Sequence, residues 1–260
     1  MKLHFHKYQG TGNDFILIDD RNMQFPIDKL EIISQLCDRK FGIGADGFML
    51  IRPHETVDFT MIFFNPDGSK SLCGNGSRCA MAFATHLGIV GKQMAFETTD
   101  GIHDGYYKDG LYHFQLFDVN EIIRSDETYF INTGSPHHVQ IVQNVQSCDV
   151  VVEGKKIRYS SKYEPAGTNV NFIQKKVDSI DVRTYERGVE NETLSCGTGV
   201  TACAIVAALE NYQSPIKVET QGGNLQVSFT KVDDTHFKDI YLAGPAEKVF
   251  EGDIEVELSN

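Results

Sequence analysis

Two short motifs could do chemistry, because each joins a cysteine to two closely spaced glycines. Cys73-Gly74-Asn75-Gly76 and Cys196-Gly197-Thr198-Gly199 share the pattern Cys-Gly-x-Gly and lie 196 − 73 = 123 positions apart. A stretch rich in Ala and other apolar residues follows each motif, so we expect each cysteine to stand directly before a helix. Unpaired backbone N–H groups and the helix dipole favour a thiolate there.

A duplicated thiol of this kind suits one class of reaction. If the two halves of the chain are related by a pseudo-twofold axis, the sulfurs would face each other across one cleft. One thiolate could then remove a proton from one face of a carbon, and the other thiol could return a proton to the opposite face. A single buried structural cysteine before a turn would explain either motif alone, but it does not explain the repetition.

Other chemistries fit the sequence less well. The remaining cysteines do not form Cys-x-x-Cys pairs, so we expect no metal site, and His4 and His6 are expected to be a surface or core pair. The glycine-rich segments at 10–13 and 42–44 lack the spacing of nucleotide-binding loops. A thiol protease could use His137 as its base, but the second cysteine motif would then have no role.

The elements that must position the thiols repeat along the chain. A β-rich run ends before each motif, at Phe59–Phe64 and Ile180–Tyr185, and hairpin signals follow at Asp100-Gly101, Asp109-Gly110 and Gly222-Gly223. The helices after the cysteines lack a polar face, so each should be buried within its own sheet. Asp28 to Glu31 resembles a capping box that opens a surface helix ending before Gly42. Residues 249–258 alternate like a strand.

We therefore expect an α/β (α+β) fold with two similar domains, each a mostly antiparallel sheet or barrel wrapped around a buried central helix. The expected domains are 1–118, completed by a C-terminal strand at 247–260, and 119–246.

Composition excludes several function classes. The chain has 260 residues with 24 Lys and Arg against 36 Asp and Glu, a net charge of −12, which argues against nucleic acid as a partner. The longest uncharged run, at 194–209, is too short to span a membrane, and the N-terminus lacks the pattern of a secretory signal. We expect a cytoplasmic protein whose six cysteines are thiols.

Six blocks, in order along the chain, together resemble the signature of the diaminopimelate epimerase family. They are Gly10-Thr11-Gly12-Asn13-Asp14-Phe15, Asn65-Pro66-Asp67-Gly68-Ser69, Cys73 to Cys79, Gly167-Thr168-Asn169-Val170-Asn171-Phe172, Tyr185-Glu186-Arg187-Gly188 and Cys196-Gly197-Thr198-Gly199. The cysteine blocks alone would admit proline racemases or phenazine-biosynthesis isomerase-like proteins. The opening block and Glu-Arg-Gly point to the epimerases, and the resemblance spans essentially the whole chain.

The resemblance implies a cofactor-independent, two-base inversion at one α-carbon of LL-2,6-diaminopimelate, which gives the meso isomer for lysine and peptidoglycan synthesis. It implies that Cys73 and Cys196 are the bases and that amides around Gly74, Asn75, Gly197 and Thr198 hold the α-carboxylate. It assigns the two amino-acid ends of the substrate to Asn13, Asn65, Asn169, Glu186 and Arg187, with His137 in support. We also expect a small-molecule substrate and a homodimer.

Two places depart from the family pattern. The segment 189–193 is one residue longer than usual, with Asn191 where Gly is common, and Ser135 precedes Pro136-His137 where many members have Asn. Because Asn tolerates a positive φ, we expect the turn at Asn191 to survive.

Two other functions stay open at this point. One is a racemase or epimerase of another amino acid, such as a proline derivative. The other is a non-catalytic amino-acid-binding protein, which would be expected to lack one of the cysteines.

Overall fold

The computed structural model describes residues 1–257 and divides into two compact units. Unit 1 comprises residues 1–114 together with the C-terminal segment from Pro245, and unit 2 comprises residues 115–244. Residues 258–260 of the expected C-terminal strand lie outside the described residues. Within residues 1–257, none of the helices combines the length and the apolar character that a membrane span requires.

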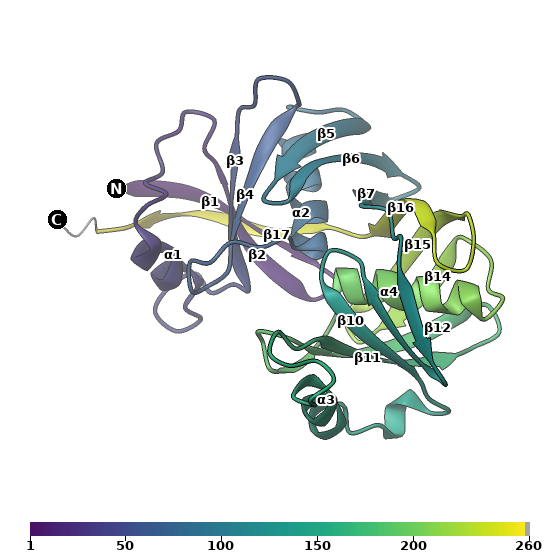
Figure 1. Cartoon of the computed structure of the whole chain (residues 1–260). Coiled ribbons are helices and arrows are strands. Elements are labelled where there is room, and N and C mark those ends of the chain that lie inside the picture. Colours follow the sequence, from purple (N-terminus) through teal and green to yellow (C-terminus); the bar gives the residue numbers. More distant parts are fainter. Residues whose placement is uncertain (258–260) are drawn as a thin grey trace. The chain divides into compact units, whose positions relative to one another are not determined.

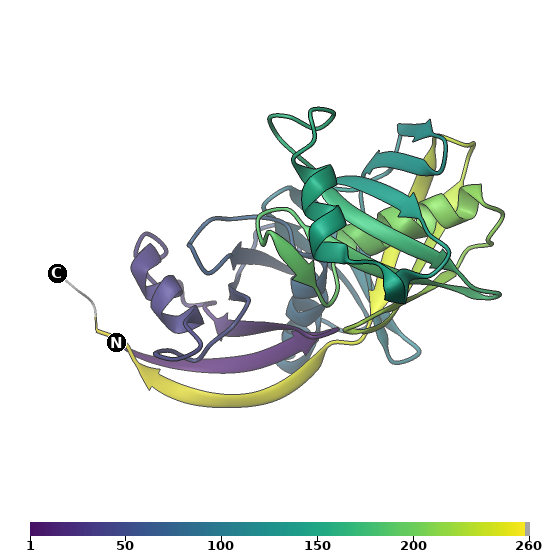
Figure 2. The same cartoon turned by 90° about the horizontal axis from the view of Figure 1, so that it is seen from below.

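Unit 1 is a mixed β-sheet with two helices (Figure 1). Its elements in chain order are β1 (Lys2–Gly10), β2 (Asn13–Asp19), α1 (Leu30–Cys37), β3 (Gly47–Arg52), β4 (Phe59–Phe64), α2 (Gly74–His86), β5 (Gln93–Thr98), β6 (Gly101–Lys108), β7 (Leu111–Leu116) and β17 (Glu247–Glu255). The last strand returns to pair with the first, and Figure 2 shows β17 (yellow) running beside β1 (purple).

Unit 2 has the same kinds of element. They are β8 (Ile122–Ser125), β9 (Thr128–Asn132), β10 (Pro136–Ile141), a 3-10 turn at Val145–Ser147, α3 (Val150–Arg158), β11 (Asn169–Lys175), β12 (Ser179–Glu186), β13 (Asn191–Thr193), α4 (Gly197–Leu209), β14 (Ile216–Thr220), β15 (Gly223–Lys231) and β16 (Phe237–Gly244).

The two units share one strand order and one pattern of pairing. In unit 1 the order is β17-β1-β2-β3-β4-β5-β6-β7, with β2–β3 and β4–β5 parallel and the other neighbours antiparallel. In unit 2 the order is β8-β9-β10-β11-β12-β14-β15-β16, with β10–β11 and β12–β14 parallel. The sheets are therefore mostly antiparallel, as predicted, and the sequence repeat corresponds to a repeat of topology.

The helix that follows each cysteine lies in the core of its unit. Helix α2 is buried from Gly74 to Ala84 and packs against β1, β2, β3, β4 and β17. Helix α4 is buried along nearly its whole length and packs against strands of unit 2. The sequence predicted both helices as buried on all sides, and the structure confirms this because neither helix has a polar stripe that could face water.

Two local predictions need correction. Helix α1 begins at Leu30 after Lys29, which makes no side-chain cap, so Asp28 does not form the predicted capping box. The turns predicted at Asp100-Gly101 and Gly222-Gly223 lie one residue earlier, at residues 99–100 and 221–222. Gly101 and Gly223 instead begin the next strand, both with a φ of +137°. Asp109-Gly110 forms the predicted turn, with φ of +52° and +83° as a type I′ hairpin requires.

Candidate active site

Cys73 is the N-cap residue of α2, in extended backbone with φ −132° and ψ 108°. Its sulfur accepts a hydrogen bond from the amide of Gly76 at 3.4 Å. The helix begins after Cys73 because its sulfur accepts a bond from one of the first helical N–H groups, which have no acceptor within the helix. The thiol is half-buried and stands at the positive end of the helix dipole.

A chain of amide side chains fixes the surroundings of this sulfur. Asn13 Nδ2 donates to Asp46 Oδ2 at 2.7 Å, which leaves its Oδ1 facing Cys73 Sγ at 3.7 Å. Asn75 Nδ2 also donates to Asn13 Oδ1, at 3.4 Å. The structure thus brings Asn13, Gly74 and Asn75 together around Cys73 within unit 1.

Asn65 lies in the turn that connects β4 to Cys73. Its side-chain Nδ2 donates to Ser69 Oγ at 3.0 Å and to Ser71 Oγ at 3.2 Å, and its backbone carbonyl accepts from the Gly68 amide at 2.9 Å. These bonds give Asn65 the turn-stabilising role that its position beside a Pro-Asp-Gly sequence would produce without any substrate.

Cys196 occupies the same position at α4, with φ −115° and ψ 112°. It is 7% exposed, and its sulfur lies 3.6 Å from the hydroxyl oxygen of Thr198 rather than on a backbone amide. Gly199 follows in the first turn, where an added Cβ would lie 2.4 Å from Asn171 Oδ1. The motif glycine is therefore required by the close approach of a neighbouring strand.

A hydrogen-bond relay reaches Thr198 from the core of unit 2. Asn171 Nδ2 donates to His137 Nδ1 at 3.0 Å, so the proton of a neutral His137 is on Nε2, which donates to Thr198 Oγ1 at 2.9 Å. Burial, with a smaller effect of the Arg187 charge, lowers the pKa of His137 to about 3, so the ring is neutral at pH 7. With its oxygen accepting from His137, the Thr198 hydroxyl is free to donate its proton to the Cys196 sulfur, 3.6 Å away.

Sequence reasoning did not select two residues that hold His137 and Thr198 in place. Asn171 lies in the block 167–172 that carried the family resemblance, two positions after Asn169, and it is fully buried. Thr133 donates its hydroxyl to the Thr198 carbonyl at 2.8 Å. The period of two along a strand could have indicated Asn171, since residues 169 and 171 lie on one face, but nothing in the sequence marked Thr133.

The side chains predicted to bind the ends of a substrate form a second group in unit 2. Asn169 Oδ1 accepts from the backbone amide of Arg187 at 2.9 Å, and Asn169 Nδ2 donates to Ser135 Oγ at 2.9 Å. The Glu186 carboxylate accepts a hydrogen bond from the Thr193 hydroxyl at 2.8 Å. Ser135, which departs from the family pattern, thus contacts a predicted site residue.

The Arg187 guanidinium has no carboxylate partner among residues 1–257. Its side chain donates to the Ala166 carbonyl at 3.3 Å. A half-buried cation without a partner carboxylate is suited to an anionic ligand.

The longer segment after Arg187 keeps its turn, but not at Asn191. Positive φ values occur at Gly188 and Glu190, +95° and +57°, whereas Asn191 begins β13 opposite Glu186. The Glu190 carboxylate accepts bonds from the Gly188 amide at 3.0 Å and from Tyr159 at 2.9 Å. These bonds compensate for a left-handed conformation that Glu rarely adopts.

The other cysteines do not share the environment of Cys73 and Cys196. All six are free thiols in the structure. Burial raises the pKa of Cys37 to about 12 and raises those of Cys79, Cys148 and Cys203. These four are therefore protonated at neutral pH.

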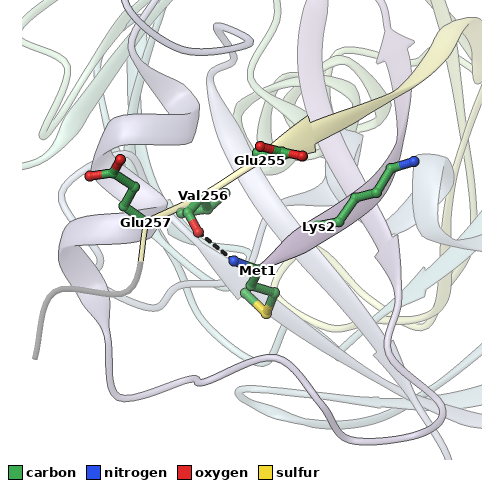
Figure 3. A pocket seen from close by; sticks show the side chains of 5 residues that line it. All are labelled: Met1, Lys2, Glu255, Val256 and Glu257. Carbon is green, nitrogen blue, oxygen red and sulfur yellow. Dashed lines mark hydrogen bonds between the residues drawn. The ribbon is translucent and has the colours of Figure 1, made fainter.

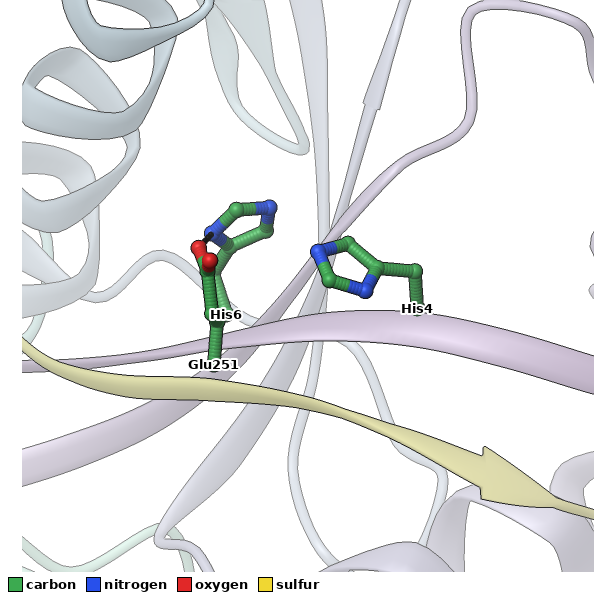
Figure 4. A group of neighbouring side chains, drawn as sticks. All are labelled: His4, His6 and Glu251. Carbon is green, nitrogen blue, oxygen red and sulfur yellow. Dashed lines mark ion pairs between the residues drawn. The ribbon is translucent and has the colours of Figure 1, made fainter.

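His4, His6 and Glu251 gather on β1 and β17 (Figure 4). His4 is exposed and His6 is buried, so the predicted pair is half surface and half core. Lys248 already forms an ion pair with Glu251, and His4 Nδ1 lies 2.9 Å from Asp253. The charges of this group are thus satisfied by protein side chains.

A shallow surface pocket lies where the described ends of the chain meet, lined by Met1, Lys2, Glu255, Val256 and Glu257 (Figure 3). The Met1 ammonium donates to the Val256 carbonyl at 2.6 Å. None of the predicted site residues lines this pocket.

Comparison with known proteins decides the family. A family model described as diaminopimelate epimerase matches residues 5–109 and 129–249. This chain belongs to the diaminopimelate epimerase family. It is 48% identical over 256 residues to the diaminopimelate epimerase of Flavobacterium psychrophilum, covering 96% of this chain and 99% of that protein. It is 41% identical to that of Aquifex aeolicus, covering 98% and 99%. The chain is accordingly an isomerase of the epimerase type.

Solved structures with low sequence identity to this epimerase share its fold. A phenazine biosynthesis protein of the PhzF family from Bacillus anthracis superposes with a TM-score of 0.77 at 15% identity, covering 98% of this chain and all (100%) of that one. A hydroxyproline epimerase from Agrobacterium vitis superposes with a TM-score of 0.68 at 13% identity, covering 97% and 92%. At these identities the likeness shows the fold alone.

Proposed function

We propose that this epimerase inverts one α-carbon of LL-2,6-diaminopimelate to give the meso isomer, with two cysteines as the acid and base and with no cofactor. The carrying observation is the equivalence of Cys73 and Cys196. Each is the N-cap of the buried helix in a unit of the same topology, in a chain of the diaminopimelate epimerase family. The other four thiols lack this position.

The proposed reaction begins with one thiolate and one thiol. The thiolate takes the α-proton, the bonding electrons pass into the adjacent carboxylate, and the opposite thiol delivers its proton to the other face of the carbon. One S–H bond forms and another breaks, so protons and charge balance while the roles of the two sulfurs exchange. The proposal requires both sulfurs to reach a single carbon, about 3 to 3.5 Å from each.

The α-carboxylate would be held by backbone amides at the helix N-termini, at Gly74 and Asn75 and at Gly197 and Thr198. Two properties support this role: the first amides of each helix have no intrahelical acceptor, and the helix dipole favours an anion there. Negative charge that develops during proton removal would be stabilised by the same amides.

The two amino-acid ends of the substrate would be bound by Asn13, Asn65, Asn169, Glu186 and Arg187. Arg187 carries a guanidinium with no carboxylate partner among residues 1–257, which suits a substrate carboxylate. Glu186 supplies the charge complement for an ammonium group. His137 would support Cys196 through Thr198, since the relay directs the hydroxyl proton toward the sulfur.

The proposal extends to the organisation of the protein. The two epimerase domains would be 1–118 with 247–260, and 119–246, related by a pseudo-twofold axis, and the protein would act as a homodimer. The product would serve lysine and peptidoglycan synthesis. Because both thiols must be reduced, the reaction belongs in a reducing compartment, the cytoplasm.

Solvent-deuterium incorporation tests the function. The purified protein, under reducing conditions and without added cofactor, is incubated in D₂O with LL-diaminopimelate, and mass spectrometry follows deuterium at the α-carbon together with formation of the meso isomer. Parallel incubations use L-proline and trans-4-hydroxy-L-proline. Exchange with diaminopimelate alone is expected. Exchange with a proline derivative alone would show that the protein is a racemase or epimerase of another amino acid. Binding of diaminopimelate without exchange would show that it is a non-catalytic binding protein.

A further inference from the structure

Arg78 is a charged side chain sealed inside unit 1. It lies on α2 one turn beyond the Cys73 motif and is 0% exposed. Among residues 1–257, no carboxylate pairs with it, and its Nε has no hydrogen-bond partner. A guanidinium that is buried without a carboxylate partner lowers the stability of the fold. We therefore expect such a group to be retained for a function.

The guanidinium contacts the framework of the thiol site. Nη2 donates to Asn75 Oδ1 at 3.0 Å and Nη1 donates to the Gly74 carbonyl at 3.2 Å. With Oδ1 of Asn75 held by Arg78, Nδ2 of the same amide is turned toward Asn13 Oδ1, which faces the sulfur of Cys73. Arg78 therefore fixes the orientation of the Asn75 side-chain amide and, through it, that of the Asn13 amide beside the Cys73 thiol.

The repeat supplies an internal comparison. The position 123 residues after Arg78 is Thr201, and its hydroxyl donates to the Gly197 carbonyl at 3.0 Å. Both side chains thus bond to the carbonyl of the first residue of their helix. Only the one in unit 1 brings a positive charge.

The other charged and titratable groups near Cys73 do not cancel this charge. Cys79, next to Arg78 on α2, has its pKa raised by burial and is protonated. Asp46, beyond Asn13, pairs with Arg39 at 2.7 Å. Burial lowers the pKa of Arg78 to about 10, so the guanidinium is still charged at neutral pH.

Hydrogen bonds to the sulfurs act in both directions and are weaker. At Cys73 the Gly76 amide donates to the sulfur at 3.4 Å and favours the thiolate, whereas Asn13 Oδ1 accepts from the thiol at 3.7 Å and favours the protonated form. At Cys196 a bond donated by the Thr198 hydroxyl favours the thiolate. A thiol is a weak donor, and the hydroxyl is a neutral one. The charge of the fully buried Arg78 acts more strongly, because little solvent screens it. Arg187, whose charge acts on His137 on the Cys196 side, is only half-buried and is therefore screened more.

We infer that Arg78 is a positioning residue that makes the two thiols unequal: it orients the amides of Asn75 and Asn13 around Cys73 and favours the thiolate of Cys73 over that of Cys196. The free enzyme therefore holds its anion on Cys73 and its proton on Cys196. The inference deepens the proposed function and rests on it for its catalytic meaning, but thiol chemistry tests it without substrate.

Alkylation with iodoacetamide from pH 5 to 10, quenched and mapped by mass spectrometry, gives the pH midpoint of each thiol in the same molecules. Cys73 of the natural protein is expected to have the lower midpoint. In Arg78→Gln the Cys73 rate at pH 7 should fall about tenfold, with Cys196 unchanged. Arg78→Lys keeps the charge but not the planar fork, so its Cys73 rate should stay within about threefold while kcat falls.

Thr201→Val is the matched control, since it removes the corresponding bond without a change of charge, and the Cys73 midpoint should not move. Circular dichroism and thermal midpoints show which variants are folded. A lower midpoint for Cys196 in the natural protein would overturn the inference whether or not any variant folds. So would a folded Arg78→Gln in which both thiols keep their rates or lose reactivity equally. Failure of the proposed function would appear separately, as absent deuterium exchange in the natural protein.

Discussion

The two motif glycines, Gly76 and Gly199, occupy equivalent places but should respond differently to replacement by alanine. A Cβ at residue 199 would lie 2.4 Å from Asn171 Oδ1, whereas one at residue 76 would meet Met49 Cε and Cys73 Cβ, both at 3.3 Å. The flexible end of Met49 can move by a few tenths of an ångström. Asn171 cannot move without loss of its hydrogen bonds.

The size of the effect follows from those bonds. The Asn171 amide donates to His137 Nδ1 at 3.0 Å and to the His138 carbonyl at 3.1 Å, and it accepts from Thr184 at 2.9 Å. A shift of about 1 Å would break one or two of them, at ~1–3 kcal/mol each. Against this loss, replacement of glycine by alanine inside a helix raises the free energy of unfolding by ~0.5–1 kcal/mol. Gly199→Ala should therefore lose about 2 to 4 kcal/mol, and Gly76→Ala should stay within about 1 kcal/mol.

Thermal denaturation followed by circular dichroism measures both variants. With ~2–4 °C per kcal/mol for a chain of this size, the Tm of Gly199→Ala should fall by roughly 5 to 10 °C, and that of Gly76→Ala should change little. The relay through His137 to Thr198 would shift with Asn171, so kcat/KM of Gly199→Ala should also fall by about tenfold or more. Equal Tm values for the two variants would refute the reasoning that a rigid, fully bonded Asn171 demands glycine at residue 199.

Four further predictions concern the thiols, a cation and a buried ring. Cys73→Ala and Cys196→Ala should each abolish epimerisation in both directions, and near-normal turnover of either would contradict the two-thiol mechanism. Arg187→Lys should lower kcat/KM by about 2 kcal/mol or more through loss of a bidentate carboxylate contact, whereas the same change at exposed Arg124 should have little effect; equal effects would remove Arg187 from the site. Mild oxidation of the substrate-free enzyme should link Cys73 to Cys196 reversibly, with substrate protecting, and peptide mapping that finds another pair would refute this. The pKa of His137 is lowered from an ordinary 6.5 to about 3, so between these pH values the ring binds a proton in the unfolded chain but not in the folded chain. The stability of the fold should therefore decline as the pH falls from 6.5 toward 3. A His137→Gln variant with the same decline would exclude this ring as a cause.

Much of the fold could be predicted because the repeat and the local patterns agree. Two apolar helices without a polar face have to be buried, and a cysteine before Gly-x-Gly is placed at a helix start by the chain itself. The predicted strands at Phe59–Phe64 and within 180–185 appear as β4 and within β12. The capping box at Asp28 failed because Asp28 lies in a turn and the N-cap position falls on Lys29, which makes no side-chain cap.

By itself the sequence determined the family, the duplicated thiols and the buried helices, since these depend on residue type, spacing and periodicity. Only the tertiary structure decided what surrounds each thiol. Asn171 on β11 bonds to His137, which bonds to Thr198, and Thr133 reaches Thr198 from the segment after β9. Arg78 reaches Asn75 from within its own helix but is fully buried inside unit 1. Burial and the direction of a hydrogen bond are properties of packing between distant segments. No local pattern could therefore have shown that a buried guanidinium lies beside the Cys73 motif and a hydroxyl beside the Cys196 sulfur.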